Sequence, residues 1–140
     1  LIAAGFALVL KETGGVESLL QTVLPYMQHS KFIAVSLMLL LGLLITMGIG
    51  TSFGTIPILA VLFVPLCSNL GLSVPASVIV IAAAAALGDA GSPASDTTFG
   101  PTAGLNAANQ HSHIPDTCIP TFLHFNIALL LAALLAVYIF

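Results

Sequence analysis

The feature that most constrains this chain is a polar segment placed between long apolar runs. Residues 88–102 read G-D-A-G-S-P-A-S-D-T-T-F-G-P-T, after the apolar run 74–87 and, beyond a short polar stretch, before the run 119–140. Backbone freed by Gly and Pro is tolerated at membrane depth only where it is buried in protein or lines a cavity. Ionisable residues at that depth mark a functional site by default. The segment therefore predicts an unwound stretch between two half-helices.

Composition supports a membrane setting for the whole chain. Of the 140 residues, 59% are hydrophobic and 5% are charged, whereas about 25% of the residues in a soluble domain are charged. The length suits about four or five membrane-embedded helices at roughly 20 residues each. The chain has two lysines and no arginine, which argues against a nucleic-acid partner because phosphate binding needs clustered basic residues. We predict an all-α membrane protein whose surroundings are the lipid bilayer.

The first half of the chain predicts three helical segments. Residues 1–10 are expected to end a spanning helix, and 16–29 to form an interfacial helix, because apolar residues recur in the latter at helical spacing. Residues 32–70 predict a helical hairpin with its tip at 50–56, where the sequence reads G-T-S-F-G-T-I. The second arm of the hairpin is short for a full span, which favours a re-entrant hairpin.

The second half predicts a broken helix followed by a final spanning helix. Residues 74–112 form the broken helix, with 88–101 unwound, and 119–140 form the last span. Small residues at 82–86 suit close helix packing, and 111–116 are expected to form a loop. Apolar sequence at both ends of the chain predicts the C-terminal part of a larger inverted-repeat transporter. Two cysteines in apolar sequence are expected to be free buried thiols; they are Cys67 and Cys118.

Both interruptions offer the oxygen atoms that a bound sodium ion needs. Unwound carbonyls, hydroxyls and a carboxylate coordinate cations in transporters with broken helices. The same carboxylate can carry a proton, because burial favours its neutral form and a nearby cation favours its charged form. One site can therefore exchange protons for cations, although free amides at a helix N-terminus suit a carboxylate substrate equally well. The candidate ion- or substrate-binding residues are Gly50, Thr51, Ser52, Thr55, Asp89, Ser92, Ser95, Asp96, Thr97 and Thr98, with Na⁺ expected at Asp89 and Asp96.

Each of these residues also has an ordinary structural interpretation. Asp89 would cap the C-terminus of a helix, Asp96 would be the N-cap of the next one, and 50–55 would be a tight turn between helices. Function is favoured for the two carboxylates because the surrounding sequence is apolar.

A histidine pair precedes the last apolar run. His111 and His113 are two residues apart and followed by Asp116, but residues two apart do not share a helix face. Without a further His or Cys cluster, an ordered loop is favoured over a metal site. Because imidazole titrates near neutral pH, proton handling is the functional alternative for both histidines.

Two enzymatic signatures are present in part. G-T-S-F-G at 50–54 fits G-x-S-x-G, and Ser52, an aspartate and a histidine follow in the order of a hydrolase triad, but that motif needs a strand before the serine. Gly88 and Asp89 resemble the end of the G-x-G-D motif of intramembrane aspartyl proteases, although Ala86 occupies the first glycine position. We expect no enzyme, with an intramembrane hydrolase as the remaining alternative.

Longer motifs carry a family resemblance from about residue 32 onward. The chain has G-T-S-F-G-T before Pro57, then G-D-x-x-S-P-x-S-D-T-T, then H-x-H-I and I-P-T-F. Together they resemble the NhaC-type Na⁺/H⁺ antiporter family of the ion transporter superfamily, and most closely its amino-acid or histidine permease-like subgroup. The resemblance implies a hairpin tip at 50–55 facing a helix break at 88–98, with the transport site between them.

The resemblance further implies a multi-pass carrier of the bacterial inner membrane, often dimeric, that works by alternating access. The sequence departs from many antiporters of the family at Phe53, where they have Trp, and at Ala90 and Gly91, where they have a more polar pair. We predict secondary active Na⁺/H⁺ antiport, with Na⁺ and H⁺ as coupling ions and no other cofactor. The alternative is a proton- or sodium-coupled amino-acid or organic-acid permease or antiporter, because fewer polar groups leave room for an organic substrate.

Overall fold

The computed structural model describes residues 30–140 continuously. Before them it describes only Gly5, Leu8, Val9, residues 12–15, Ser18, Gln21, Thr22 and Pro25. The spanning-helix end predicted at 1–10 and the interfacial helix predicted at 16–29 therefore fall largely outside the described residues.

Residues 30–140 are built from helices, with no strand among them. Three of these helical segments are long and apolar enough to cross a membrane, namely α3, α4 and the continuous segment His113–Ile139, whereas α5 is shorter. The predicted all-α membrane class is thus confirmed. The elements are α3 (Lys31–Ile49), α4 (Ser52–Asn69), α5 (Val74–Asp89), α6 (Asp96–Leu105), the 3₁₀ turn η1 (Asn106–Ala108), the π-helix η2 (His113–Cys118) and α7 (Ile119–Ile139).

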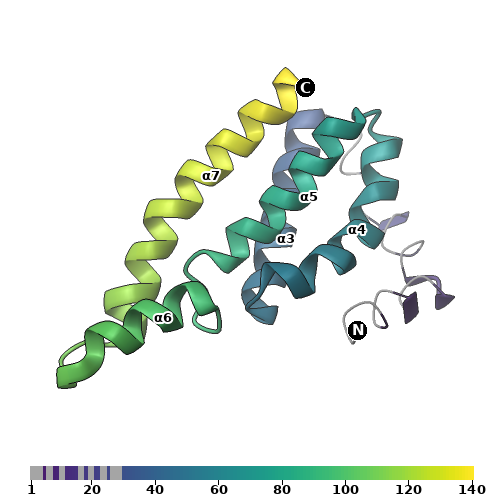
Figure 1. Cartoon of the computed structure of the whole chain (residues 1–140). Coiled ribbons are helices and arrows are strands. Elements are labelled where there is room, and N and C mark those ends of the chain that lie inside the picture. Colours follow the sequence, from purple (N-terminus) through teal and green to yellow (C-terminus); the bar gives the residue numbers. More distant parts are fainter. Residues whose placement is uncertain are drawn as a thin grey trace.

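Helix α5 is the centre of the bundle. It packs against α3, α4 and α7, whereas α3 and α4 contact each other far less (Figure 1). Small residues let the backbones of α3 and α5 approach closely. A Cβ added at Gly42 would overlap the Cβ of Ala84, and one added at Gly88 would lie 2.5 Å from the carbonyl oxygen of Leu43. Residues 82–86 were predicted to pack closely, and this contact confirms it for Ala84.

The predicted hairpin has a tighter tip than expected, and its second arm is bent. Helix α3 ends at Gly50 in the left-handed conformation (φ 79°), and α4 already begins at Ser52. The break is therefore Gly50 and Thr51 rather than 50–56, because the residues that follow form helical hydrogen bonds. Pro57 and Pro65 lie inside α4, where proline bends a helix, and Figure 1 shows α4 bent away from α3.

The unwound part of the second segment is also narrower than 88–101. Helix α5 continues to Asp89, and α6 begins at Asp96 because the Ser95 hydroxyl caps it by accepting a hydrogen bond from the Thr97 amide. Only residues 90–95 are unwound between the two helices.

The segment predicted as a loop at 111–116 is mostly helical in the structure. The π-helix η2 occupies His113–Cys118 and runs directly into α7. The Ser112 amide donates to Asp116 Oδ2 at 2.7 Å, which satisfies a free amide at the start of the helix, where Pro115 is also tolerated. The final helical rod therefore begins six residues before the predicted start at 119.

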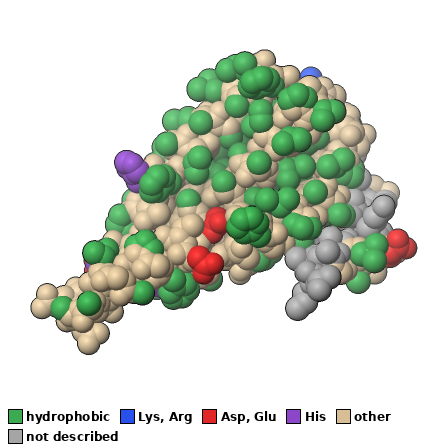
Figure 2. All heavy atoms as spheres, in the orientation of Figure 1, with side chains coloured by type: hydrophobic (Ala, Val, Ile, Leu, Met, Phe, Trp, Pro, Cys, Tyr) green, Lys and Arg blue, Asp and Glu red, His purple; other side chains and the backbone are tan. Residues whose placement is uncertain are grey.

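The surface of the described bundle is strongly apolar. Large hydrophobic side chains are exposed on every long helix, and Phe53, Val74 and Leu135 are 88%, 78% and 67% exposed. Figure 2 shows apolar side chains spread over most of the face in view. Such a surface suits contact with lipid or with other membrane-embedded protein, because exposing so much apolar area to water is unfavourable.

Candidate ion or substrate site

The two helix breaks touch each other at Gly50. A Cβ added at Gly50 would lie 2.7 Å from the Cβ of Ala94 and 2.8 Å from its carbonyl oxygen. Glycine is needed at this position for two reasons. The positive φ disfavours other residues, and the unwound segment leaves no room for a side chain. The tip between α3 and α4 and the unwound segment 90–95 therefore form one structural unit.

Asp89 lies at the centre of this unit. It is half-buried at the end of α5, and the Ser52 hydroxyl donates to its Oδ2 at 2.8 Å, with the Ser52 amide at 3.4 Å. The Ser95 hydroxyl contacts the other carboxylate oxygen, Oδ1. Ser52 is the first residue of α4 and Ser95 is the N-cap of α6. The carboxylate is thus held between two helix N-termini, where the helix dipoles favour negative charge.

A ring of contacts connects Asp89 with the start of α6. The Ser95 and Thr97 hydroxyl oxygens lie 2.8 Å apart, and the Thr97 hydroxyl also lies 3.0 Å from the carbonyl oxygen of Asp89. Asp89, Ser95 and Thr97 are therefore joined in one ring of contacts, which includes a carboxylate oxygen and the backbone carbonyl oxygen of Asp89.

Two other predicted residues brace the inside of the unwound segment. The buried Thr98 hydroxyl donates to the carbonyl oxygens of Ser92 and Ser95. The Ser92 hydroxyl donates to the carbonyl oxygen of Met47 on α3 at 3.1 Å and accepts from the Ala94 amide at 3.2 Å. These hydroxyls satisfy backbone groups that the helix break frees, which is a cost that such a break must meet in a membrane.

The remaining predicted residues lie apart from this cluster. Thr55 is fully buried, and its hydroxyl donates to the carbonyl oxygen of Thr51 within its own helix. Asp96 is exposed and forms no side-chain hydrogen bond with the part of the chain that the structure describes. Its interpretation as an N-cap is wrong, because Ser95 takes that role. Asp96 remains a predicted ligand without a partner in this region.

Asn126 on α7 was not among the predicted site residues. It is 4% exposed, and its Nδ2 donates to the carbonyl oxygen of Ala90 at 2.7 Å. Its Oδ1 is the one buried side-chain oxygen or nitrogen without a hydrogen-bond partner in the described region, and such an atom is costly unless something binds it. A carboxamide inside a largely apolar spanning helix was the sequence signal that could have indicated it.

A second polar cluster contains both histidines. The Thr102 hydroxyl lies 2.8 Å from His113 Nδ1 and 2.9 Å from the Thr117 hydroxyl, which lies 2.7 Å from His111 Nε2. His113 Nε2 lies 2.8 Å from the carbonyl oxygen of Pro93 in the unwound segment. No group of three or more His, Cys, Asp or Glu residues in the described region could hold a metal ion. The free thiols predicted earlier are confirmed, and both cysteines are buried.

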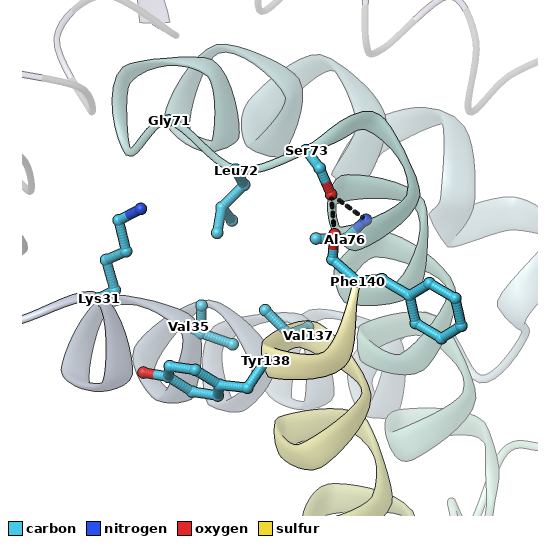
Figure 3. A pocket seen from close by; sticks show the side chains of 9 residues that line it. All are labelled: Lys31, Val35, Gly71, Leu72, Ser73, Ala76, Val137, Tyr138 and Phe140. Carbon is cyan, nitrogen blue, oxygen red and sulfur yellow. Dashed lines mark hydrogen bonds between the residues drawn. The ribbon is translucent and has the colours of Figure 1, made fainter.

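Two cavities accompany these features. One of about 210 Å³ lies beside the unwound segment and is lined mainly by apolar groups, including Met47, Gly91 and Phe122. Another of about 290 Å³ lies at the other end of the bundle, where Lys31 and Tyr138 face it and the Ser73 hydroxyl donates to the carbonyl oxygen of Phe140 (Figure 3). Neither cavity has an Asp or Glu side chain in its lining, so the candidate site is the Asp89 carboxylate at the helix breaks, with the first cavity beside it.

Apolar spanning helices around a break that encloses a carboxylate define a multi-pass, all-α membrane protein. The sequence profile described as the Na⁺/H⁺ antiporter family matches residues 1–137, and the chain belongs to that family. This confirms the resemblance drawn from the motifs.

Named relatives support the same assignment. The protein called "Putative amino acid transporter YuiF" of Bacillus subtilis is 59% identical over 131 residues, which is 94% of this chain and 30% of that protein. An uncharacterized membrane protein of Vibrio parahaemolyticus is 57% identical over 129 residues, 92% of this chain and 29% of that protein. The chain thus spans under a third of the length of these relatives. No solved structure matches the chain.

Proposed function

We propose that this chain forms part of a secondary active transporter that exchanges a cation, with Na⁺ as the first candidate, for a proton at Asp89. The observation that carries the proposal is the position of the Asp89 carboxyl group, which joins Ser52 at one helix break to Ser95 at the other. A group that bonds to both breaks can link its own charge state to their separation, and alternating access needs such a link. Membership of the Na⁺/H⁺ antiporter family supports the same chemistry.

The count of protons around Asp89 favours a proton-carrying role. If Asp89 is ionised, the Ser95 hydroxyl donates to Oδ1 and the Thr97 hydroxyl donates to the Asp89 carbonyl, so no hydrogen remains for the 2.8 Å contact between the two hydroxyl oxygens. If Oδ1 carries a proton, it donates to Ser95, Ser95 donates to Thr97, and Thr97 donates to the carbonyl. Every contact in the ring then has one hydrogen, and each hydroxyl donates once.

The same oxygen atoms suit a cation once that proton leaves. The ionised carboxylate and the Ser52 and Ser95 hydroxyls offer oxygen ligands, and hard cations prefer such ligands. The orphaned Oδ1 of Asn126 belongs to a side chain bonded to Ala90, directly after Asp89, and we include it in the proposed ligand set. A proton and a cation would then compete for one carboxylate, which is the basis of antiport.

The alternative is proton- or sodium-coupled transport of an amino acid or organic acid. The relative named as a putative amino acid transporter is 59% identical to this chain. In this version the ammonium group of an amino acid pairs with Asp89, and the apolar cavity of about 210 Å³ beside the unwound segment accepts its side chain. We propose the bacterial inner membrane as the location, and a homodimer as the assembly.

A hydrolase is disfavoured by the surroundings of Ser52. The helix α3 precedes it where the hydrolase motif needs a strand, and its hydroxyl is bonded to Asp89 rather than to a histidine. We therefore propose transport without an enzymatic activity.

The test uses the full-length protein in liposomes with an interior pH dye and an imposed proton gradient. Sodium is added first, then a panel of amino acids and dicarboxylates, to wild type, Asp89→Asn and Asp116→Asn. We expect coupled proton movement in wild type, its loss in Asp89→Asn, and near-normal flux in Asp116→Asn, because Asp116 is exposed and only caps a helix. Coupled flux that persists in Asp89→Asn would refute the proposal. A response to an organic solute and none to sodium would select the alternative.

A further inference from the structure

The second polar cluster forms a continuous chain of proton-exchanging groups. His113, Thr102, Thr117 and His111 follow one another with separations of 2.8, 2.9 and 2.7 Å between their side-chain atoms. The two threonines in the middle are 9% and 6% exposed, so water has little access to the hydroxyl groups. From this geometry we infer that the cluster is a proton relay between the two imidazoles, running through the two hydroxyls.

The partner at one end sets the direction of the bonds. His113 Nε2 lies 2.8 Å from the carbonyl oxygen of Pro93, and a carbonyl can only accept. The Nε2 atom of His113 therefore keeps its hydrogen, and Nδ1, which faces Thr102, is the atom that gains or loses a proton. Phe99 stacks on the His113 ring with centroids 4.6 Å apart, which holds the ring plane in position.

The relay step conserves every proton. In the first state His113 is protonated, Nδ1–H donates to Thr102, Thr102 donates to Thr117, and Thr117 donates to Nε2 of neutral His111. Each hydrogen then moves to its acceptor: the Nδ1 proton to Thr102, the Thr102 proton to Thr117, and the Thr117 proton to His111. His111 ends protonated and His113 ends neutral, with both hydroxyls reversed. One positive charge has moved from one imidazole to the other.

Counting the hydrogens in the same way shows that the relay accommodates one protonated imidazole and disfavours protonation of both. If both imidazoles are protonated, His111 and Thr102 both donate to the Thr117 oxygen, and the Thr117 hydroxyl has no acceptor in the chain. An unmade hydrogen bond in a buried place is unfavourable. Protonation of His113 should therefore oppose protonation of His111 through the hydroxyls, in addition to the repulsion of like charges through space.

Other titratable groups lie near the relay and are part of its surroundings. Cys118 Sγ is 3.5 Å from His113 Nε2, and Asp116 on η2 accepts from the Ser112 amide. Asp96, at the start of α6, is on the same helix as Thr102. Because His113 also contacts Pro93, the relay ends at the unwound segment that follows Asp89. Its use in transport rests on the proposed function, whereas the coupling of the two imidazoles does not.

The coupling is measured by nitrogen-15 NMR of the full-length protein in liposomes, with labelled histidine and a pH titration of each assigned imidazole. Replacing His113 by Gln in the wild-type background removes the competing proton, and the protonation constant of His111 should rise about tenfold, the effect of about one hydrogen bond. In a Thr102→Val background, the same replacement should change the His111 constant much less. Charge repulsion through space would act equally in both backgrounds, so equal changes would overturn the relay.

Matched variants separate the relay from folding. Thr102→Ser keeps the hydroxyl and should keep the coupling, whereas Thr117→Val interrupts the relay at a different place and should abolish it. Thr121→Val is the control, because Thr121 is half-buried on α7 and its hydroxyl is outside the relay. Loss of coupling in Thr121→Val as well would contradict the relay. If the imidazoles are coupled and the liposomes show no proton-coupled flux, the proposed function fails and the relay stands.

Discussion

Replacement of Gly50 by alanine tests whether contact between the two helix breaks is needed. The new Cβ would lie 2.7 Å from the Cβ of Ala94 and 2.8 Å from its carbonyl oxygen, at a residue with φ 79°. The left-handed conformation costs an alanine roughly 1–2 kcal/mol, and crowding of a packed contact costs about 1–3 kcal/mol. We therefore expect a loss of about 2–5 kcal/mol in the arrangement with touching breaks.

Gly48→Ala is a matched control two residues away. It lies within α3, and a Cβ added there meets nothing within 4 Å, so alanine should be neutral or stabilise the helix by up to about 1 kcal/mol. Thermal unfolding and proton flux of the full-length protein are measured for both variants. We expect Gly50→Ala to unfold at a lower temperature and to transport poorly, and Gly48→Ala to resemble wild type. Equal stability and flux in the two variants would refute the contact between the breaks.

Two further substitutions probe the site and the bundle. Asn126→Leu removes the orphaned oxygen and the hydrogen bond to Ala90. We expect the free energy of unfolding to change by only about 1 kcal/mol, and the half-saturating concentration of the transported cation or solute to rise about tenfold. An unchanged concentration dependence of transport would exclude Asn126 from the site. Gly88→Ala places a Cβ 2.5 Å from the carbonyl oxygen of Leu43, whereas Gly104→Ala meets nothing within 4 Å. Only the first should weaken packing of α3 on α5, by about 1–3 kcal/mol in thermal unfolding, and equal melting temperatures would contradict that contact.

Part of the candidate site could be predicted from the local sequence. Gly50, Ser52, Asp89, Ser95 and Thr97 were predicted as site residues, and the structure places them together. Their role in binding stays a prediction. Glycine, proline, serine and threonine inside apolar runs indicate helix breaks, because glycine and proline disfavour a continuous helix and hydroxyl groups can satisfy the backbone that a break frees.

From the sequence, Asp89 and Asp96 were equally good candidates for the site, but the structure gives them different surroundings. Asp89 and Asp96 stand in the same polar segment, but Asp89 is bonded to residues of two helices whereas Asp96 is exposed. Which of them faces the other break depends on where α5 ends and α6 begins. The capping of α6 by the Ser95 hydroxyl settles that boundary.

The amino-acid sequence by itself determined the membrane class, the apolar helices and the approximate positions of both breaks. These properties follow from runs of neighbouring residues, because transfer into lipid and the breaking of a helix depend on local composition. Tertiary structure alone decided that Asn126 meets Ala90, that Gly50 meets Ala94, and that two threonines join His111 to His113. A hydrogen bond acts over about 3 Å, so its partners are known only when the helices are packed together.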